Sequence, residues 1–509
     1  MMTPPDPAFR GAGENATQGN HRRMRLLTVL AVCMLFAPTV RAGPWIDPGN
    51  SSLRNDIQVL ADEGVISGPV STWPLSTGDL LAALDADLTA LSPAGRVALS
   101  RLRKHLDEAA RIGDVQFLGR ASATQHPREI RTFEDGPRET GEIGVGLEWT
   151  GERYAVRLQG QWVNDPDDNK DLRADDSYVG VALGNWMLAA STSQRYWGPG
   201  WQSSMLLSNN ARPIPAFTLE RNATTPFGSR WLSWIGSWDL AVMWGFLDDD
   251  RAVPNARVLG GRFNFRPLES LEIGISGLGL WCGSGNDCGL DEISDVVTGG
   301  GQSDEFDRVG GFDVRWSSRL FDVPFALYTH IVGEDFGDGG GRLIFPSKIL
   351  GQFGAETWGY WDGVGNYRFF LEWADTECDF SLGRKLTGDG DGGKPGCAYR
   401  NSTYRSGETY RGKSFAHSFD QDSSIATLGS VLSTYDETSW TATVAGGKIN
   451  RRGANLSTVA PNETDYWEVE IGHRRPFWIG EVRLGLGYEY RKDQVTEEND
   501  DDFRAFLEL

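Results

Sequence analysis

A strict two-residue alternation near the C-terminus constrains the fold more than any other feature of this sequence. The segment Glu481–Arg491 has one apolar face, made of Val482, Leu484, Leu486, Tyr488 and Tyr490. Its other face carries charged residues and glycine, as expected when successive side chains point to opposite sides of a β-strand. Segments of about ten residues with the same pattern recur through most of residues 113–509. This repetition predicts an all-β transmembrane barrel that is apolar outside and polar inside.

The predicted barrel contains about 18 antiparallel strands, an even number as in other single-chain bacterial barrels. Clear alternations start near residues 142, 154, 239, 313, 367 and 467, and a shorter one covers Phe217–Arg221. Charged residues recur on the inner face, which predicts a polar, hydrated lumen. Glycine- and aspartate-rich gaps at residues 283–307, 375–422 and 456–463 are predicted to be long extracellular loops.

Composition and charge exclude other classes of protein. The mean hydropathy is −0.37, and no run of 18 apolar residues follows the N-terminal segment, which excludes a helical membrane protein. The net charge of −21 makes nucleic acid an improbable partner. It also disfavours simple charge attraction to an acidic polysaccharide.

The first 42 residues have the pattern of a secretory signal peptide. Arg22, Arg23 and Arg25 precede the apolar run Leu26–Ala37, and small residues at Val40 and Ala42 allow cleavage after Ala42. Export to an oxidising compartment favours two short-loop disulfides among the remaining cysteines, Cys282–Cys288 and Cys378–Cys397. Neither pair has CxxC spacing or a nearby histidine, so we predict no metal site and no cofactor.

Residues 43–112 change to a helical period. Leu53, Ile57 and Leu60 form one apolar stripe, and Ser92-Pro93 is a strong start signal for a helix that ends near Arg111. Three short helices bury little surface alone, so we expect a small bundle docked on the periplasmic end of the barrel. An independent periplasmic adaptor domain is the alternative.

No motif indicates an enzyme. The loop Gly388–Pro395 nearly spells a phosphate-binding loop, but it has proline in place of Ser/Thr and lies between cysteines without a flanking strand and helix. Asp389 and Asp391 lack the downstream glutamate of an EF-hand. There is no G-x-S-x-G, and the histidines are scattered. A hydrolase with a Ser–His pair remains an alternative, since such pairs assemble only in space.

Four stretches in combination resemble the Wzi family of capsule-assembly outer-membrane proteins. They are Arg195–Pro215 (RYWGPGWQSSMLLSNNARPIP), Pro44–Pro74, Leu371–Thr376 (LEWADT) and Tyr399–Ser424. The chain departs from many outer-membrane barrels in ending at Leu509 rather than at an aromatic residue. The resemblance implies an 18-stranded outer-membrane barrel with a periplasmic helical bundle. It also implies a lectin that holds capsular polysaccharide on the cell surface and neither polymerises nor exports it.

Two sets of residues have the chemistry of a polysaccharide site. Aromatic faces stack on sugar rings, while amide and guanidinium groups bind hydroxyls and carboxylates. The first set is Arg195, Trp197, Trp201, Asn209, Asn210 and Arg212, and the second is Tyr399, Tyr404, Tyr410, Arg411 and His417. The alternative is a structural role, as a rigid plug or an interfacial belt. If Arg195 or Arg212 lies inside the barrel, we expect lumen carboxylates such as Glu148 or Glu372 as partners.

Three functions therefore compete. The first is a surface lectin for capsular or extracellular polysaccharide, with outer-membrane lipid and the polysaccharide export machinery as further partners. The second is a porin or substrate-selective channel, because 18 strands can enclose an aqueous pore. The third is the outer-membrane hydrolase. A lumen filled by the Arg195–Pro215 segment and the helices would separate the first from the second.

Overall fold

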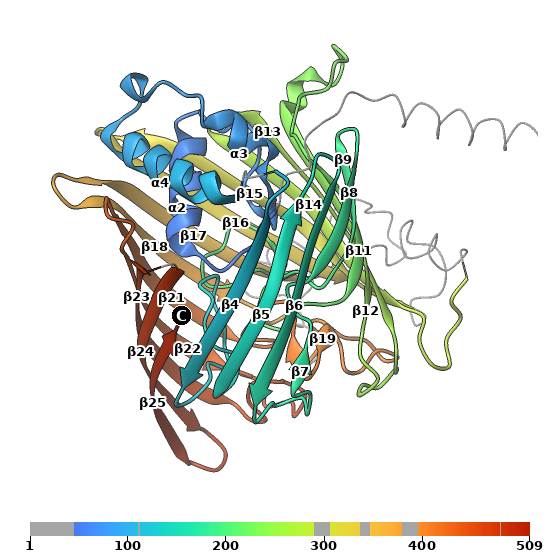
Figure 1. The fold of residues 1–509 in the computed structure, drawn as a ribbon. Coiled ribbons are helices and arrows are strands. Elements are labelled where there is room, and N and C mark those ends of the chain that lie inside the picture. The colour runs from blue at the N-terminus through green and yellow to red at the C-terminus, as the bar shows by residue number, and fades with distance from the viewer. Residues whose placement is uncertain (1–44, 110–111, 290–305, 336–346, 379–394, 479) are drawn as a thin grey trace, which may run out of the picture.

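The computed structural model describes residues 45–109, 112–289, 306–335, 347–378, 395–478 and 480–509 (Figure 1). The predicted signal peptide, residues 1–42, lies outside the described residues, as does the glycine-rich motif at 388–395 except for Pro395.

The strands form one closed antiparallel barrel, which confirms the predicted fold class. The two-residue β7 and the longer β8 share one place beside β6, so eighteen strand positions close the ring. The segment at Phe217–Arg221 is one of them, within β11. The strands are β4 (Val115–Thr124), β5 (Gly141–Thr150), β6 (Tyr154–Asn164), β7 (Leu172–Arg173), β8 (Tyr178–Leu183), β9 (Trp186–Ser191), β11 (Ala216–Arg221), β12 (Ser237–Phe246), β13 (Arg257–Leu268), β14 (Leu271–Trp281), β15 (Asp307–Leu320), β16 (Val323–Asp335), β17 (Ser347–Trp361), β18 (Gly365–Asp375), β21 (Ser424–Thr434), β22 (Ser439–Ile449), β23 (Thr464–Phe477), β24 (Gly480–Asp493) and β25 (Asn499–Glu508).

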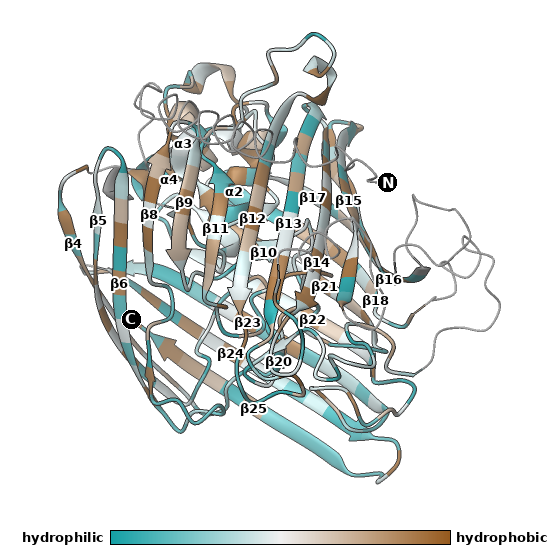
Figure 2. Ribbon diagram, turned by 90° about the vertical axis from the view of Figure 1, so that its right-hand side faces the viewer, coloured by the Kyte–Doolittle hydropathy of each residue, from teal (hydrophilic) through white to brown (hydrophobic). Residues whose placement is uncertain are grey.

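The wall follows the alternation in the sequence. In β24 the apolar side chains point outward, with Leu484 44% and Leu486 55% exposed, whereas Arg483 and Glu489 are buried inside. Hydrophobic colour covers much of β9, β11 and β12, while the start of β25, Asn499–Asp502, is hydrophilic (Figure 2). The outward apolar face is the surface that a barrel presents to lipid.

Three α-helices gather at one end of the barrel: α2 (Ser51–Asp62), α3 (Thr77–Ala83) and α4 (Pro93–Ala109) (Figure 1). Two short 3₁₀ turns, η1 (Leu88–Ala90) and η2 (Ser233–Ile235), complete the described helical structure. The predicted start of α4 is confirmed, because the Ser92 hydroxyl accepts a hydrogen bond from Gly95 N at 3.1 Å. Within the described residues, no helix is long and apolar enough to cross a membrane.

Helix α2 lies in the mouth of the barrel, where every residue from Ser51 to Ala61 is buried. It packs against β21 and β22, while α4 packs against β17 and β18. Arg315 of β15 binds both carboxylate oxygens of Asp62 at 2.7 and 2.9 Å, and Arg368 of β18 donates to Asn55 at 2.8 Å. These contacts join the helices to the inner wall.

The lumen differs from the hydrated interior that the sequence predicts. An apolar cluster occupies its middle, with Met205 and Leu206 packed near Tyr404, Phe415 and wall residues such as Val332. Many inward charges pair with one another: Arg504 lies 2.7 Å from Glu489, and Arg483 lies 2.8 Å from Glu508. The charged inner face therefore lines a packed interior, because loops fold back into the barrel and take the place of water.

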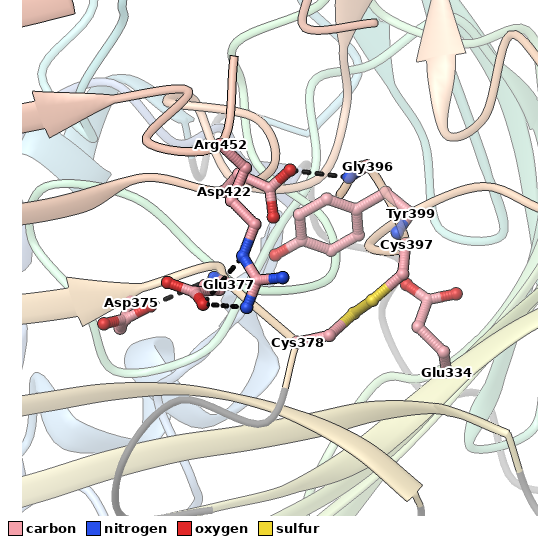
Figure 3. The surroundings of a disulfide bond; sticks show 9 residues. All are labelled: Glu334, Asp375, Glu377, Cys378, Gly396, Cys397, Tyr399, Asp422 and Arg452. Atoms are coloured by element: carbon pink, nitrogen blue, oxygen red, sulfur yellow. Dashed lines mark hydrogen bonds and ion pairs between the residues drawn. A yellow bond between two sulfur atoms is a disulfide. The ribbon is translucent and has the colours of Figure 1, made fainter. Parts of the chain in front are cut away.

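Both predicted disulfides are present. Cys282 and Cys288 have Cα atoms 4.7 Å apart, and Cys378 and Cys397 have Cα atoms 6.3 Å apart. The second bond closes the long connection between β18 and β21 beside Tyr399 and a group of carboxylates (Figure 3). One of these, Glu377, accepts a hydrogen bond from Arg452 Nε at 2.9 Å.

Candidate functional site

The segment between β9 and β11, residues 193–215, folds into the barrel and is called the inward segment below. It contains the first predicted site set. Its short strand β10 (Tyr196–Trp197) pairs with β2 (Thr72–Trp73) from the helical region. Trp197 N donates to Leu207 O at 2.9 Å, so the inward segment also closes on itself. Trp197 is only 2% exposed as a result.

Trp201 is also packed inside. Its ring stacks on Phe370 of β18 with centroids 5.4 Å apart, and its indole N–H donates to Glu356 at 2.9 Å. Glu372 accepts hydrogen bonds from the backbone N–H groups of Trp201 and Gln202. Neither tryptophan of the set presents a face to solvent in this structure.

Arg195, Asn209 and Asn210 hold neighbouring loops together. Arg195 donates to the carbonyl oxygens of Ser193 and Ile214 at 3.1 and 3.0 Å. Asn209 donates to Phe133 O at 3.3 Å, which lies in the β4–β5 connection. Asn210 donates to Ser414 O at 3.0 Å and accepts from Arg131 N at 3.1 Å. All three side chains are buried.

The second set lies on residues 395–423, called the returning loop below. Three of its members are fully inside: Tyr399, Tyr404 and His417, each 2% exposed or less. The Tyr404 hydroxyl donates to Cys282 O at 3.0 Å, and the His417 ring accepts from Phe419 N at 3.4 Å. Tyr399 N donates to Glu334 of β16. These residues fix the returning loop to the wall.

The expected partners of Arg195 and Arg212 are corrected by the structure. Glu148 binds Arg157 and Tyr178, and Glu372 binds the inward-segment backbone. Arg195 donates instead to the carbonyl oxygens of Ser193 and Ile214 and to the Ser191 hydroxyl. Arg212 instead forms a two-bond pair with Asp175, at 2.9 and 2.8 Å, and a further pair with Asp168. Both aspartates lie in the β6–β8 connection, which passes directly over this part of the inward segment.

The structure brings together the three predicted residues that stay nearest to solvent: Arg212 from the first set, and Tyr410 and Arg411 from the second. The hairpin β19–β20 (Thr409–Tyr410 and Lys413–Ser414) carries Tyr410 and Arg411. The Arg411 guanidinium lies 5.6 Å from the centre of the Tyr410 ring, and Arg411 N donates to Asp248 at 2.9 Å. We call Arg212, Tyr410, Arg411 and Lys413 the hairpin cluster.

The hairpin cluster lies at the barrel end opposite the helices, where β7 and β19 are labelled in Figure 1. Gly412 at its tip is exposed, and Arg411 and Lys413 are half-buried. Burial raises the pKa of Tyr410, and the Arg411 and Arg212 guanidinium groups act in the opposite direction. The cluster therefore places cationic donors that suit hydroxyl and carboxylate groups beside Tyr410, which is only 6% exposed.

Sequence reasoning missed two contributors to this surface. Lys413 lies 3.4 Å from Asp167, and Arg251 supports the hairpin by donating to Thr409 O and Gly407 O at 2.8 and 2.9 Å. Arg251 lies outside the stretches singled out in the sequence, and Lys413 lies within Tyr399–Ser424 among aromatic residues that drew attention in its place. Among the described residues, no group of three or more His, Cys, Asp or Glu side chains is arranged to hold a metal ion.

A closed antiparallel barrel whose interior is filled by its own loops and helices is a plugged transmembrane β-barrel. Residues 114–505 match the family described as Capsule assembly protein Wzi, and the chain belongs to this family. The resemblance noted in the sequence is thereby confirmed.

The known proteins that resemble the chain include one from Klebsiella pneumoniae and one from Escherichia coli. A Klebsiella pneumoniae protein, described as an uncharacterized 55.8 kDa protein in the cps region, is 29% identical over 340 residues. The match spans 65% of this chain and 65% of that protein, less than two thirds of its length. The Escherichia coli structure of Wzi is described as an outer membrane protein involved in group 1 capsule assembly and a carbohydrate-binding β-barrel. It is 23% identical with a TM-score of 0.77, and the match covers 92% of this chain and 99% of that chain. At this identity the likeness concerns the fold.

Proposed function

We propose that this protein is an outer-membrane lectin that holds capsular or other extracellular polysaccharide at the cell surface. Membership of the capsule-assembly family supports this role, and so does the carbohydrate binding ascribed to the E. coli barrel. The observation that carries the proposal is the hairpin cluster. It brings cationic groups from two distant stretches together at the outer end of the barrel, beside the buried Tyr410 ring.

The proposed orientation places the helices in the periplasm and the hairpin cluster outside the cell. The long connections that form the inward segment and the returning loop enter from the hairpin end, and the connections at the helix end are mostly short turns. Long extracellular loops and short periplasmic turns are the rule for bacterial barrels. The helical end is also where an export complex in the periplasm would make contact.

A binding role is favoured over transport by what occupies the interior. The inward segment and returning loop contribute Trp197, Met205 and Phe415 to one apolar cluster with the barrel wall. Arg54 of α2 reaches this region from the other end. A channel needs a continuous aqueous path through the lumen. In the described residues, this packing fills the lumen.

A binding role is also favoured over hydrolysis. His330 and His417 are the fully buried histidines of the described chain. Neither ring nitrogen of His330 has a hydrogen-bond partner, and the partner of His417 is a backbone N–H. A serine nucleophile needs a histidine base within hydrogen-bond reach, so neither histidine is set up as such a base.

The decisive experiment compares cell-bound with released polysaccharide at equal total production. Deletion of the gene is expected to move polymer from the cells to the medium. A plasmid copy restores retention, whereas the double variant Arg411→Ala/Lys413→Ala restores it only in part. The matched control is Lys448→Ala/Lys492→Ala, which removes the same charge from another part of the rim. Unchanged bound and free fractions on deletion would refute the lectin role.

A further inference from the structure

The barrel closes through an unusually short seam between its last and first strands. β25 pairs with β24 from Arg483 to Lys492, but with β4 only through Phe506, Leu507 and Glu508. These three residues lie opposite Thr124, Ala123 and Ser122, at the far end of β4 from the helices. The helix-side half of β4 therefore extends past the end of β25.

Among the described residues, this offset leaves the helix-side edge of β4 without a neighbouring strand, and we call this part of the wall the notch. Ala121 and Leu509 exchange backbone hydrogen bonds of 3.0 and 2.9 Å, the last ones across the seam. Alternate residues beyond them, Val115, Phe117 and Gly119, direct backbone groups toward the same side. In the part of the chain that the structure describes, no strand pairs with that edge.

The notch faces the lipid. Phe117 is opposite Leu147 in the β4–β5 register, Val115 is opposite Trp149, and these side chains belong to the outward face. Phe117 is 87% and Val115 53% exposed. Unpaired backbone edges are tolerated within a bilayer only where polar groups satisfy them, usually by lining a hydrated or occupied cavity.

A cavity of about 370 Å³ lies directly behind the notch. Arg483 of β24 lines it on one side, and Asp114 and Gln116 at the start of β4 line it on the other. Asp47 and His105 contribute from the helical region. The volume is within the range of about 300–1,000 Å³ that is typical of small-molecule sites.

The cavity carries charges of both signs. Arg157 pairs with Glu148 at 3.1 Å and with Asp47, and Arg474 lies 2.9 Å from Glu134. Two acidic groups keep free acceptors among the described residues. Within the described part of the chain, the second carboxylate oxygen of Asp47 is buried without a hydrogen-bond partner, and the exposed Asp114 forms no ion pair.

We propose that this cavity binds the head group of a zwitterionic glycerophospholipid from the leaflet on the helix side. The ammonium group lies against Asp114 and Asp47, and the phosphate lies toward His105 and Arg474. The acyl chains leave through the notch and cover Val115 and Phe117. A mixed-sign lining suits a zwitterion better than a polyanion. The inference is independent of polysaccharide binding and goes beyond the proposed function.

Photo-crosslinking tests this site in the full-length protein. Phe117→p-benzoylphenylalanine is placed at the notch, and the control substitution is at Phe217, which is 50% exposed on the outward face of β11. Both proteins are isolated from nanodiscs of palmitoyl-oleoyl phosphatidylethanolamine and phosphatidylglycerol, washed in detergent, irradiated and examined by mass spectrometry. The expected result is a phosphatidylethanolamine adduct at position 117 and none at 217.

A second variant tests the charged lining. In the Phe117 background, His105→Ala/Asp114→Ala is expected to lower the adduct yield at least about tenfold. The matched control is His126→Ala/Asp502→Ala, an exposed His–Asp pair away from the cavity, which leaves the yield unchanged. Heat-modifiable migration verifies that each barrel is folded. Equal adducts at 117 and 217, a preference for phosphatidylglycerol, or a yield insensitive to His105 and Asp114 would overturn the proposal.

Discussion

Arg54 of α2 donates hydrogen bonds to Gly200 O and Pro199 O at 2.7 and 2.6 Å, which joins the helical end of the barrel to the inward segment. The same guanidinium lies 4.3 Å from the centre of the Phe133 ring and 4.2 Å from that of Trp201. One side chain thus connects a helix, the inward segment and the β4–β5 connection. The inward segment is therefore bound by α2 on the helix side and by the returning loop on the hairpin side.

Arg54→Ala is expected to weaken the packed interior without unfolding the wall. The substitution removes two hydrogen bonds that the guanidinium group donates and two of its contacts with aromatic rings. We therefore expect the free energy of unfolding to fall by about 2–4 kcal/mol. The loss of stability is measured on a gel, as the temperature at which the folded form of the barrel converts to the migration of the unfolded form. Arg54→Lys keeps the charge but not the planar fork, so we expect it to recover less than half of the loss. A wild-type transition for Arg54→Ala would contradict this account.

The wild-type barrel is expected to carry no steady ion current in planar bilayers. The described lumen is packed from the helices to the hairpin cluster, so no aqueous path crosses it. Arg54→Ala should add brief openings as the inward segment loosens. A sustained ohmic current from the wild type would show that the interior opens spontaneously, and would revive the channel hypothesis.

Trp197→Ala and Arg411→Ala are expected to fail in different ways. Trp197 is buried, so its truncation should destabilise the protein by about 3–5 kcal/mol. Arg411 is half-buried on the outer hairpin, so its loss should leave the unfolding temperature within a few degrees and weaken retention of polysaccharide. Thermal unfolding and a retention assay on both variants separate the two roles. Weakened retention by a stably folded Trp197→Ala protein would instead place sugar binding on the inward segment.

Glu408, next to the hairpin, predicts a pH dependence. Burial raises its pKa well above 4.5, and the nearby Glu334 adds to this rise. Since the folded pKa exceeds the unfolded one, protonated Glu408 is compatible with the fold, and stability falls as the pH rises above about 4.5. Glu408→Gln should therefore stabilise the hairpin at pH 8 and have little effect at pH 4. Protease resistance of the returning loop at the two pH values measures this, with the exposed Glu497→Gln as control.

The wall of this barrel could be predicted from the sequence because side-chain alternation has one physical reading in a membrane. Leu484 and Leu486 must face lipid, so Arg483 and Glu489 must face inward. The disulfides followed from spacing and compartment, and the start of α4 from the Ser92-Pro93 signal.

The interior could not be predicted in the same way. A segment rich in Trp, Arg and Asn can stack on a sugar or pack inside a barrel, and both uses need the same side chains. The outcome depends on partners distant in sequence, such as Phe370 for Trp201 and Asp175 for Arg212. The offset between β4 and β25 likewise depends on how the first and last strands meet when the barrel closes, and the sequence of neither strand determines it alone.

The links through the interior also determine how the molecule responds to pulling. Under the proposed function, tension on a polymer bound at the outer hairpin would pass from Ser414 to Asn210, along the inward segment to Gly200, and through Arg54 into α2. The helix spreads that load over the wall through the ion pair of Asp62 with Arg315. The load would thus reach α2 and β15 rather than the returning loop alone.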